Sequence, residues 1–418
     1  MDTGVLSLII ILIIAVVFLT DRLPVAVVTM AGAIICGVLG LIDYPSVFSG
    51  LAGTTSILLM SMMIVGSSLF HTGLADRISR AFLKVTGTTE TGIMLSVMVL
   101  SALMSSICNN VGVVVTLMPI VMGICKRSKL SPSRLLMPLG YGSAVGGAIT
   151  LVGTASSVTC NGVLEGLGLP SLGFLDFAWV GIPLTVLTIL YMLTLGKKLI
   201  PNYEINLDEI QEAGETEADR GKMIISGIVL ICVVLGMAFN PGGIPLYMIS
   251  SIGALVVILT GCITEKQAYA SISWPVIVIA GGMIAVSNAV SKSGGGDMIA
   301  NFVVEVLGKN SSPYLITAVL LLVVTVMTQF LSNVSTAALM TPIAVFIAQG
   351  IGVNPVTMAM IVAIGANASF MTPVGTQSLT TICDPGHYKF RDYVKVGTPV
   401  VLINFLIGLV LIPLIWPF

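Results

Sequence analysis

A polar stretch that occurs twice inside an otherwise hydrophobic chain constrains the fold more than any other feature. Residues 331–342, LSNVSTAALMTP, lie in one of the most apolar regions of the sequence, and residues 108–119, CNNVGVVVTLMP, repeat the pattern. Asn110 matches Asn333 without a gap. Because polar groups are costly to bury in an apolar environment, we expect both stretches to meet other protein segments.

The composition indicates a membrane protein. Of the 418 residues, 56% are hydrophobic and 9% are charged, against about 25% charged residues in a soluble domain. The mean hydropathy is +1.07. We predict an all-α polytopic protein of the cell membrane that crosses the lipid bilayer many times. The scattered cysteines, without a CxxC pair, indicate no zinc site, and a net charge of −1 without a basic block argues against nucleic acid as a partner.

Each half of the chain contains five stretches that can cross a bilayer as helices, since a crossing needs about 20 mostly apolar residues. In the first half they are 3–20, 24–42, 54–71, 133–165 and 177–196, and in the second half 223–240, 244–262, 274–291, 355–385 and 393–416.

Between the third and fourth crossing of each half lies a segment with the polar stretch in its middle, 92–125 and 312–348. Its shorter leg has about 14 residues, roughly 21 Å of helix against a bilayer core of about 30 Å. We therefore predict re-entrant hairpins. The long fourth crossings should break at 149–157 and 371–379, where Pro373 and the glycines disfavour helix.

The two halves match well beyond the polar stretches, and the pairs keep their order along the chain. They include Pro24/Pro245, Gly32/Gly253, Gly40/Gly261, Gly73/Gly294, Pro132/Pro355, Gly153/Gly375 and Pro183/Pro399. Five crossings is an odd number, so the second copy should be inverted in the membrane. We predict a first inverted repeat at 1–199, a cytoplasmic acidic linker at 200–222 and a second inverted repeat at 223–418.

The basic residues predict the orientation, because lysine and arginine are enriched in cytoplasmic loops. With both termini outside the cytoplasm, every lysine and arginine except Lys292 and Lys309 falls on the cytoplasmic side. Residues 73–86 and their mate 294–307 are expected to form helices that lie in the membrane interface.

The predicted breaks and tips place four helix N-termini where they can converge, near Asn110, Asn333, Ser156 and Gln377. Their unpaired N–H groups attract an anion without a buried lysine or arginine. Oxygens of Asn110, Asn333, Ser105 and Thr328 suit Na⁺, although such groups can also serve only to satisfy broken backbone.

Two enzymatic or proton-driven alternatives have little support. No charged residue lies in the middle of a predicted crossing, which argues against a proton relay. Gly294–Asp297 fits the GxGD pattern of intramembrane aspartyl proteases, but no second membrane-embedded aspartate accompanies it. We therefore expect a transporter rather than an enzyme.

The inverted repeat, the paired tips and the sequence Thr372-Pro373-Val374-Gly375-Thr376 resemble the divalent-anion:sodium symporter (DASS) family of the ion transporter superfamily. The resemblance implies a homodimer whose hairpins and broken helices move as an elevator, with a small dianion such as a C4-dicarboxylate between the tips and Na⁺ beside each. It implies substrate contacts from Asn109, Asn110, Thr154, Ser332, Asn333, Thr372 and Thr376, and Na⁺ ligands among Ser105, Asn110, Thr150, Thr328 and Asn333.

The chain departs from the family pattern at the tips. Val111 and Val334 stand where the family has threonine, and Asn109 stands where it has serine. Several alternatives remain open: a Na⁺-independent dicarboxylate or anion exchanger, another carrier of the superfamily (for citrate, sulfate, arsenite or Na⁺/H⁺ exchange), and an anion channel.

Overall fold

The computed structural model describes residues 2–20, 22–84, 89–204, 219–307 and 312–418. Within these ranges every regular element is helical, which confirms the all-α prediction. In the first half the elements are α1 (Thr3–Thr20), α2 (Val25–Val38), α3 (Tyr44–Ser49), η1 (Gly50–Ala52), α4 (Thr54–His71), α5 (Leu74–Lys84), α6 (Glu90–Ser105), α7 (Asn110–Ser128), α8 (Pro132–Gly146), η2 (Gly147–Ile149), α9 (Ala155–Gly166), α10 (Ala178–Tyr191), η3 (Met192–Gly196) and α11 (Lys197–Leu199). In the second half they are α12 (Arg220–Phe239), η5 (Pro241–Gly243), α13 (Leu246–Leu259), α14 (Glu265–Ser271), α15 (Trp274–Lys292), α16 (Gly295–Leu307), α17 (Pro313–Thr328), α18 (Asn333–Ile351), α19 (Pro355–Ala366), α20 (Gln377–Thr381) and α21 (Phe390–Ile415).

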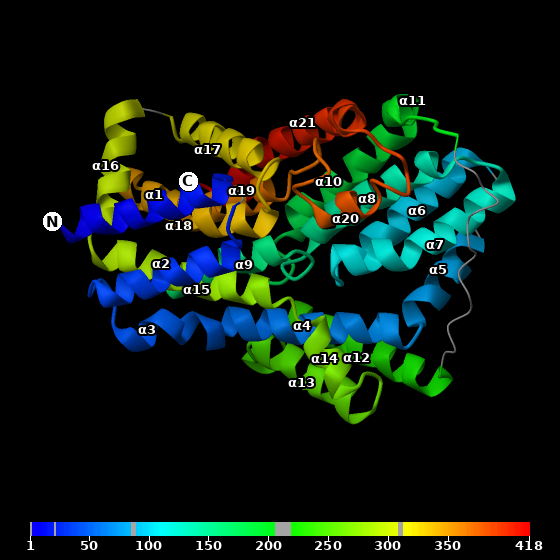
Figure 1. The fold of residues 1–418 in the computed structure, drawn as a ribbon, viewed down its shortest axis with the longest axis horizontal. Coiled ribbons are helices and arrows are strands. Elements are labelled where there is room, and N and C mark those ends of the chain that lie inside the picture. Colours follow the sequence, from blue (N-terminus) through cyan, green and yellow to red (C-terminus); the bar gives the residue numbers. More distant parts are fainter. Residues whose placement is uncertain (1, 21, 85–88, 205–218, 308–311) are drawn as a thin grey trace.

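The order of elements is the same in both halves. Each half has two helices, a short helix, a long helix, the predicted interface helix, a helical hairpin, a broken helix and a final helix. In Figure 1 the hairpin α6–α7 lies toward one end of the long axis and the hairpin α17–α18 toward the other, and α5 and α16 also lie near opposite ends.

Seven helices in the described residues are long and apolar enough to cross a membrane, the shortest of them having 19 residues. The predicted crossings 24–42 and 244–262 are shorter than expected, because α2 and α13 have 14 residues each. Both helices end at a glycine with positive φ, Gly40 at +71° and Gly261 at +68°. The following N–H groups of Leu41 and Cys262 bond back to carbonyls in the last turn, so a matched pair of glycines ends both helices.

The hairpins and broken helices form where the sequence predicts them, with one correction. The first legs, α6 and α17, have 16 residues, and the second legs, α7 and α18, have 19. The predicted crossing 355–385 is helical only in part. Its second piece, α20, has five residues, whereas its mate α9 has 12.

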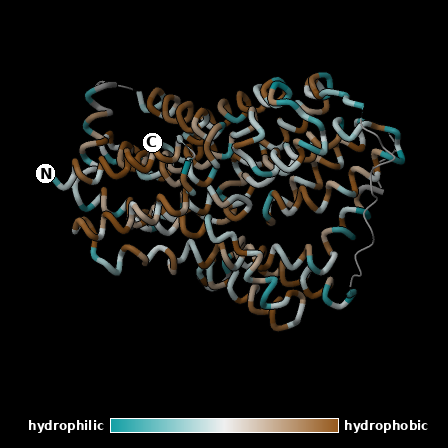
Figure 2. Tube along the Cα trace, viewed as in Figure 1, coloured by the Kyte–Doolittle hydropathy of each residue, from teal (hydrophilic) through white to brown (hydrophobic). Residues whose placement is uncertain are grey.

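Helices of one half pack against helices of the other in matched pairs. Helix α2 contacts α15 while α13 contacts α4, and α9 contacts α18 while α20 contacts α7. Hydrophobic residues run along most of the helices in Figure 2. Each broken helix is therefore held against the hairpin of the opposite half, which brings the polar stretches of both halves together.

The segment that joins the halves is described only at its ends. Residues 205–218, the greater part of the predicted linker, lie outside the described residues. Residues 200–204 pack against the first half, where Ile200 is buried.

Candidate functional site

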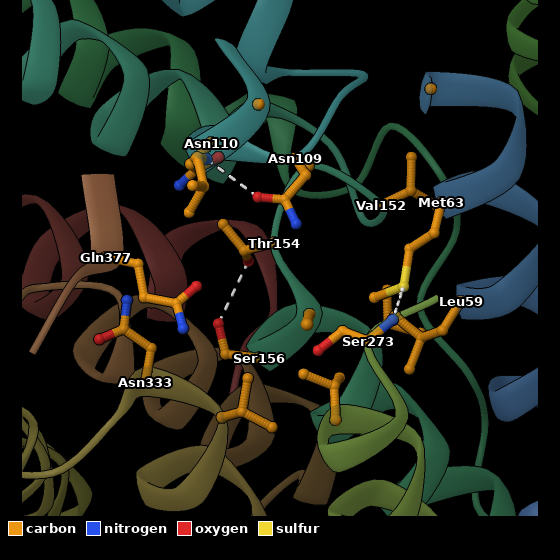
Figure 3. A pocket seen from close by; sticks show the side chains of 18 of the residues that line it. Leu59, Met63, Asn109, Asn110, Val152, Thr154, Ser156, Ser273, Asn333 and Gln377 are labelled. Atoms are coloured by element: carbon orange, nitrogen blue, oxygen red, sulfur yellow. Dashed lines mark hydrogen bonds between the residues drawn. The ribbon is translucent and has the colours of Figure 1, made fainter. Parts of the chain in front are cut away.

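A cavity of about 600 Å³ lies where the hairpin tips and the breaks meet. Four segments contribute: the tip before α7, the tip before α18, the start of α9 and the start of α20. The opposite wall comes from α4 and the start of α15. Figure 3 shows Asn109, Asn110, Asn333, Gln377, Thr154 and Ser156 around the cavity and Leu59, Met63 and Ser273 on the other side.

Four helices begin at this cavity, as the sequence predicts. Asn109 caps α7, its Oδ1 accepting from Val111 N at 2.9 Å, and Ser332 caps α18, its Oγ accepting from Ser335 N at 3.2 Å. Thr154 caps α9 by accepting from Ser157 N at 3.4 Å. Because a cap satisfies only part of a helix start, N–H groups remain that can bind an anion. The strongest contribution comes from α7 and α18, since α20 is too short for a sizeable dipole.

Among the described residues that line the cavity, none carries a charged side chain. The polar groups are amides and hydroxyls from Asn109, Asn110, Thr154, Ser156, Ser273, Ser332, Asn333, Thr376 and Gln377, among others. The valines at the tips, Val111 and Val334, also line it. A bound anion would therefore be held by dipoles and hydrogen bonds rather than by a salt bridge.

The tip of the second half surrounds the Asn333 amide with oxygens, a group that we call the second half-site (Thr328, Asn333, Ala366, Ser369 and Gly375). One amide atom of Asn333 lies 2.7 Å from Ser369 Oγ, 3.0 Å from Thr328 Oγ1, 3.0 Å from Gly375 O and 3.1 Å from Ala366 O. With nitrogen in this position the amide donates to its neighbours. With oxygen there, the amide accepts from the Thr328 and Ser369 hydroxyls. It then faces the carbonyls of Gly375 and Ala366 with no hydrogen between the oxygens, an arrangement that a cation stabilises.

Close packing of Gly375 makes the second half-site possible. A Cβ at this position would lie 2.3 Å from Thr328 O and 2.5 Å from Ser369 Cβ, which no side chain tolerates. Its mate Gly153 is equally confined, since a Cβ there would lie 2.3 Å from Gly147 O. The glycine of the repeated VGT sequence therefore lets the break approach the hairpin in the second half and lets it fold closely onto η2 in the first.

The tip of the first half is built from the matching residues but is more open; we call it the first half-site (Ser105, Asn110, Ser143 and Gly147). Ser105 Oγ donates to Asn110 Oδ1, and Ser143 Oγ donates to Asn110 O at 3.0 Å. Gly147 stands where the second half has Ser369, and a Cβ there would lie 2.7 Å from Asn110 Oδ1. Asn110 lines the cavity, and its amide nitrogen has no hydrogen bond within the described part of the chain.

Two predicted site residues, Thr150 and Thr372, do not line the cavity. Thr150 Oγ1 donates to Ser106 O at 2.5 Å, and Thr372 Oγ1 donates to Gln329 O at 2.6 Å. Each threonine thus ties a break to the end of the first hairpin leg in its own half. Thr154 and Thr376, from the same VGT sequences, do line the cavity.

Four buried residues that our sequence analysis did not select contribute to the site: Ser143, Ser369, Gln329 and Asn367. Gln329 Nε2 donates to Thr325 O and Ala368 O, both at 2.8 Å, and its Oε1 accepts from Met371 N at 3.0 Å. A polar side chain within an apolar stretch is the available signal for Gln329 and Asn367, but neither residue type is repeated at the aligned position of the other half.

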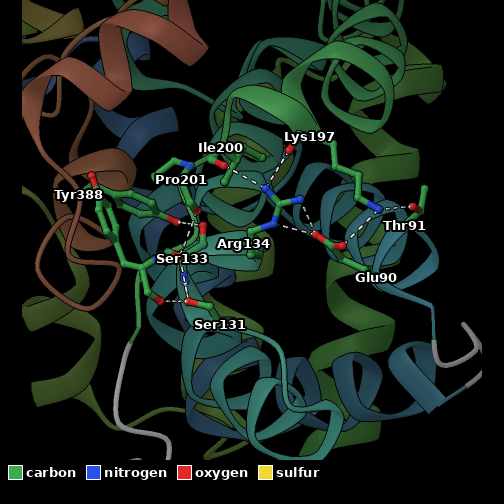
Figure 4. A network of polar contacts seen from close by, with 10 residues as sticks. Glu90, Thr91, Ser131, Ser133, Arg134, Lys197, Ile200, Pro201 and Tyr388 are labelled. Atoms are coloured by element: carbon green, nitrogen blue, oxygen red, sulfur yellow. Dashed lines mark hydrogen bonds and ion pairs between the residues drawn. The ribbon is translucent and has the colours of Figure 1, made fainter.

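Away from the cavity, a polar network fixes the outer end of the first hairpin (Figure 4). Arg134 on α8 pairs with Glu90 at the start of α6 at 2.7 Å, and Lys197 pairs with the same carboxylate at 3.2 Å. Arg134 also donates to the carbonyls of Lys197 and Ile200, at 2.8 and 2.9 Å. Helices α6 and α8 and the end of the first half are thereby joined.

The same region continues into the second half through Tyr203. Its backbone N–H donates to Ser133 Oγ at 3.0 Å, and its hydroxyl donates to the Asp392 carboxylate at 2.8 Å. The hydrogen bond to Asp392 raises the pKa of Tyr203. Tyr388 adds a second link, donating to Ser133 O and accepting from Met137 N.

Comparison with known proteins identifies transporters. A family model described as "Citrate transporter" matches residues 15–365 and 330–417. The chain is 23% identical to the uncharacterized transporter YfbS of Escherichia coli, with 96% of this chain and 97% of that protein covered. It is 22% identical to the sodium-dependent dicarboxylate transporter SdcS of Staphylococcus saprophyticus, with 97% and 85% covered.

A solved structure shares the fold. The YdaH transporter of Alcanivorax borkumensis superposes with a TM-score of 0.64 at 14% identity, covering 99% of this chain and 98% of that one. Together with the named relatives, this confirms the resemblance predicted from the tips and the TP-x-GT motif.

Proposed function

The chain belongs to the citrate transporter family, and we propose that it is a secondary active transporter of small divalent organic anions, such as C4-dicarboxylates, driven by Na⁺. The observation that carries this proposal is the convergence of four helix N-termini and two oxygen-rich half-sites on one cavity without charged side chains. Helix N-termini suit carboxylates, and clusters of carbonyl, amide and hydroxyl oxygens suit Na⁺.

We assign the substrate to the space between the tips. Asn109 and Asn110 from one tip, Ser332 and Asn333 from the other, and Thr154 and Thr376 from the breaks line this space. Their amides and hydroxyls are hydrogen-bond donors of the kind that bind carboxylate oxygens. Thr372 acts indirectly in this proposal, by fixing the break through its bond to Gln329 O.

We assign Na⁺ first to the second half-site. A cation there would be held by the Asn333 side-chain oxygen together with the carbonyls of Ala366 and Gly375. A second Na⁺ would use Ser105 and Asn110 in the first half-site, with Thr150 holding the adjacent backbone. A Na⁺ gradient would supply the free energy for dianion accumulation, and two cations balance the charge of one dicarboxylate.

We propose that the hairpins, the broken helices, α10 and α21 move together as an elevator. Support comes from contacts that join this group across the halves: Tyr388 bonds to Ser133 on α8, and Tyr203 of the linker bonds to Asp392 on α21. The cavity lies between this group and α4 and α15, so the substrate would travel along a fixed wall. The repeats 1–199 and 223–418, inverted about the linker 200–222, would build both the moving and the fixed parts.

The charge bias supports a plasma-membrane orientation with both termini outside the cytoplasm. The family resemblance suggests a homodimer, which the mass of the purified protein in detergent would test.

Uptake of labelled succinate and citrate into proteoliposomes tests the transport proposal. An inward Na⁺ gradient is compared with vesicles that are preloaded with unlabelled anion in the absence of Na⁺. Accumulation that follows the Na⁺ gradient is the expected result. Uptake only into preloaded vesicles would identify an exchanger, the alternative that Val111 and Val334 favour because they remove a hydroxyl from each tip.

A further inference from the structure

One buried side chain of the second half holds the helix start of the first half. Asn367 is 3% exposed and follows the last residue of α19. Its Nδ2 donates to Thr154 Oγ1 at 3.2 Å and to Ser157 Oγ at 3.4 Å, and its Oδ1 accepts from Ser156 Oγ at 2.6 Å. All three partners belong to the first turn of α9 or its cap.

The neighbour of Asn367 belongs to the second half-site. The carbonyl of Ala366 accepts from Thr328 Oγ1 at 2.6 Å and lies 3.1 Å from the Asn333 amide. A change in the second half-site that moves this carbonyl therefore moves the backbone that carries Asn367. The side chain passes the movement to Thr154 and Ser156, which line the anion cavity.

Only the second half supplies such a side chain to the other half. The aligned position of the first half is Ala144 or Val145, depending on which matched motif sets the alignment, and neither side chain can form hydrogen bonds. The asymmetry indicates a role beyond satisfying backbone at a break, because the matching break of the other half is built without such a residue.

We propose that Asn367 is a positioning residue that couples Na⁺ at the second half-site to anion binding at the start of α9. The inference rests on the proposed function. Na⁺ bound at Asn333 fixes the Ala366 carbonyl, and Asn367 then holds the hydroxyls of Thr154 and Ser156 in the direction that the anion requires. By linkage, the factor by which Na⁺ raises anion affinity equals the factor by which the anion raises Na⁺ affinity.

Binding of labelled succinate to the purified full-length protein, with Na⁺ or with choline in its place, measures this factor as a ratio of dissociation constants. We expect a ratio of about 10 or more in the wild type, within the usual range for coupled sites. In Asn367→Ala the ratio should fall at least about fivefold toward one, while succinate affinity without Na⁺ changes less.

Asn404→Ala is the matched control. Asn404 on α21 is also buried, at 1% exposure, and donates to Ile364 O on α19, the helix that Asn367 follows. It does not line the cavity. Its ratio should equal that of the wild type. Ser157→Ala removes one partner of Asn367 outside the cavity lining. It should lower the ratio in part, and it provides the test if Asn367→Ala does not fold.

The outcomes separate the two proposals. A large ratio in the wild type that persists in Asn367→Ala, or in Ser157→Ala if only that variant folds, would overturn the role of Asn367 and leave Na⁺ coupling intact. A ratio of one in the wild type would overturn Na⁺ coupling, and the role of Asn367 with it. An equal fall in Asn404→Ala would show that the effect is general to buried asparagines, which also contradicts the proposal.

Discussion

The two half-sites carry the same asparagine in different surroundings. In the second half-site four oxygens lie within 3.1 Å of one amide atom of Asn333. In the first half-site Gly147 replaces the serine, and Ser105 is the one hydroxyl bonded to the Asn110 side chain within the described residues. Asn110 itself lines the cavity. We therefore propose that the second half-site is the stronger Na⁺ site and that Asn110 of the first half-site mainly contacts the anion.

The largest expected effect comes from removing each asparagine in turn. Asn333→Ala should lower Na⁺-driven uptake by about 100-fold or more, because the buried carbonyls around it lose their partner. Asn110→Ala should act more on the substrate, raising its KM by about tenfold or more, while the Na⁺ concentration for half-maximal uptake rises less than in Asn333→Ala. Uptake measured against both concentrations distinguishes these effects, with Asn404→Ala as the control. Equal changes of both parameters in both variants would contradict the division of roles.

A second comparison concerns how firmly each tip is held. Gln329 makes three hydrogen bonds to the break and its own helix, whereas the matched Ser106 donates to Leu103 O within its own leg. Gln329→Ala should lower the free energy of unfolding by about 2–3 kcal/mol, and Ser106→Ala by about 1 kcal/mol or less. Thermal unfolding of the two variants in detergent measures the difference. Equal losses would show that the tips are held equally.

Substituting at Ser369 and Gly147 the residue found at the aligned position of the other half tests what this serine contributes. Ser369→Gly removes the hydroxyl that lies 2.7 Å from the Asn333 amide and should weaken Na⁺ dependence about tenfold. Gly147→Ser places a Cβ 2.7 Å from Asn110 Oδ1 and 2.8 Å from Thr154 Cγ2, so the tip must shift and substrate affinity should fall. If Gly147→Ser instead tightened Na⁺ binding, the missing hydroxyl would be what limits the Na⁺ affinity of the first half-site.

The sequence predicts much of this arrangement because its signals are local. Pro24 and Pro245 precede the helices that end near Gly40 and Gly261, and the polar tips stand out against apolar legs. The repeat adds information, since each boundary is marked twice. Where the halves differ, local signals are weaker: the break near Pro373 indicates an interruption but does not predict that α20 has only five residues.

The contacts that distinguish the half-sites could not be predicted in the same way. Asn367 bonds to Thr154 and Ser156, and Ser369 bonds to Asn333, across distances in sequence that no periodicity spans. Thr150 and Thr372 show the converse case, since the sequence selects them as ligands but they lie outside the cavity lining. Their position beside the VGT sequences suggests ligands, yet their hydroxyls bond to the hairpin backbone. Which oxygen faces the cavity depends on the direction of a broken backbone, and that direction is set by packing between the halves.

The smallest expected effect tests what the tip valines contribute. Val111→Thr and Val334→Thr each add a hydroxyl at the first turn of a helix that starts at the cavity. A new hydrogen bond to a carboxylate should lower the KM for succinate about fivefold, corresponding to about 1 kcal/mol. Val111→Thr should have the larger effect, since the anion donor Asn110 stands beside it, whereas Asn333 is engaged with the oxygens of its own half-site. The exposed Val115→Thr on α7, outside the cavity lining, is the control. A larger effect at Val334 would reverse the assignment of anion and cation to the two tips.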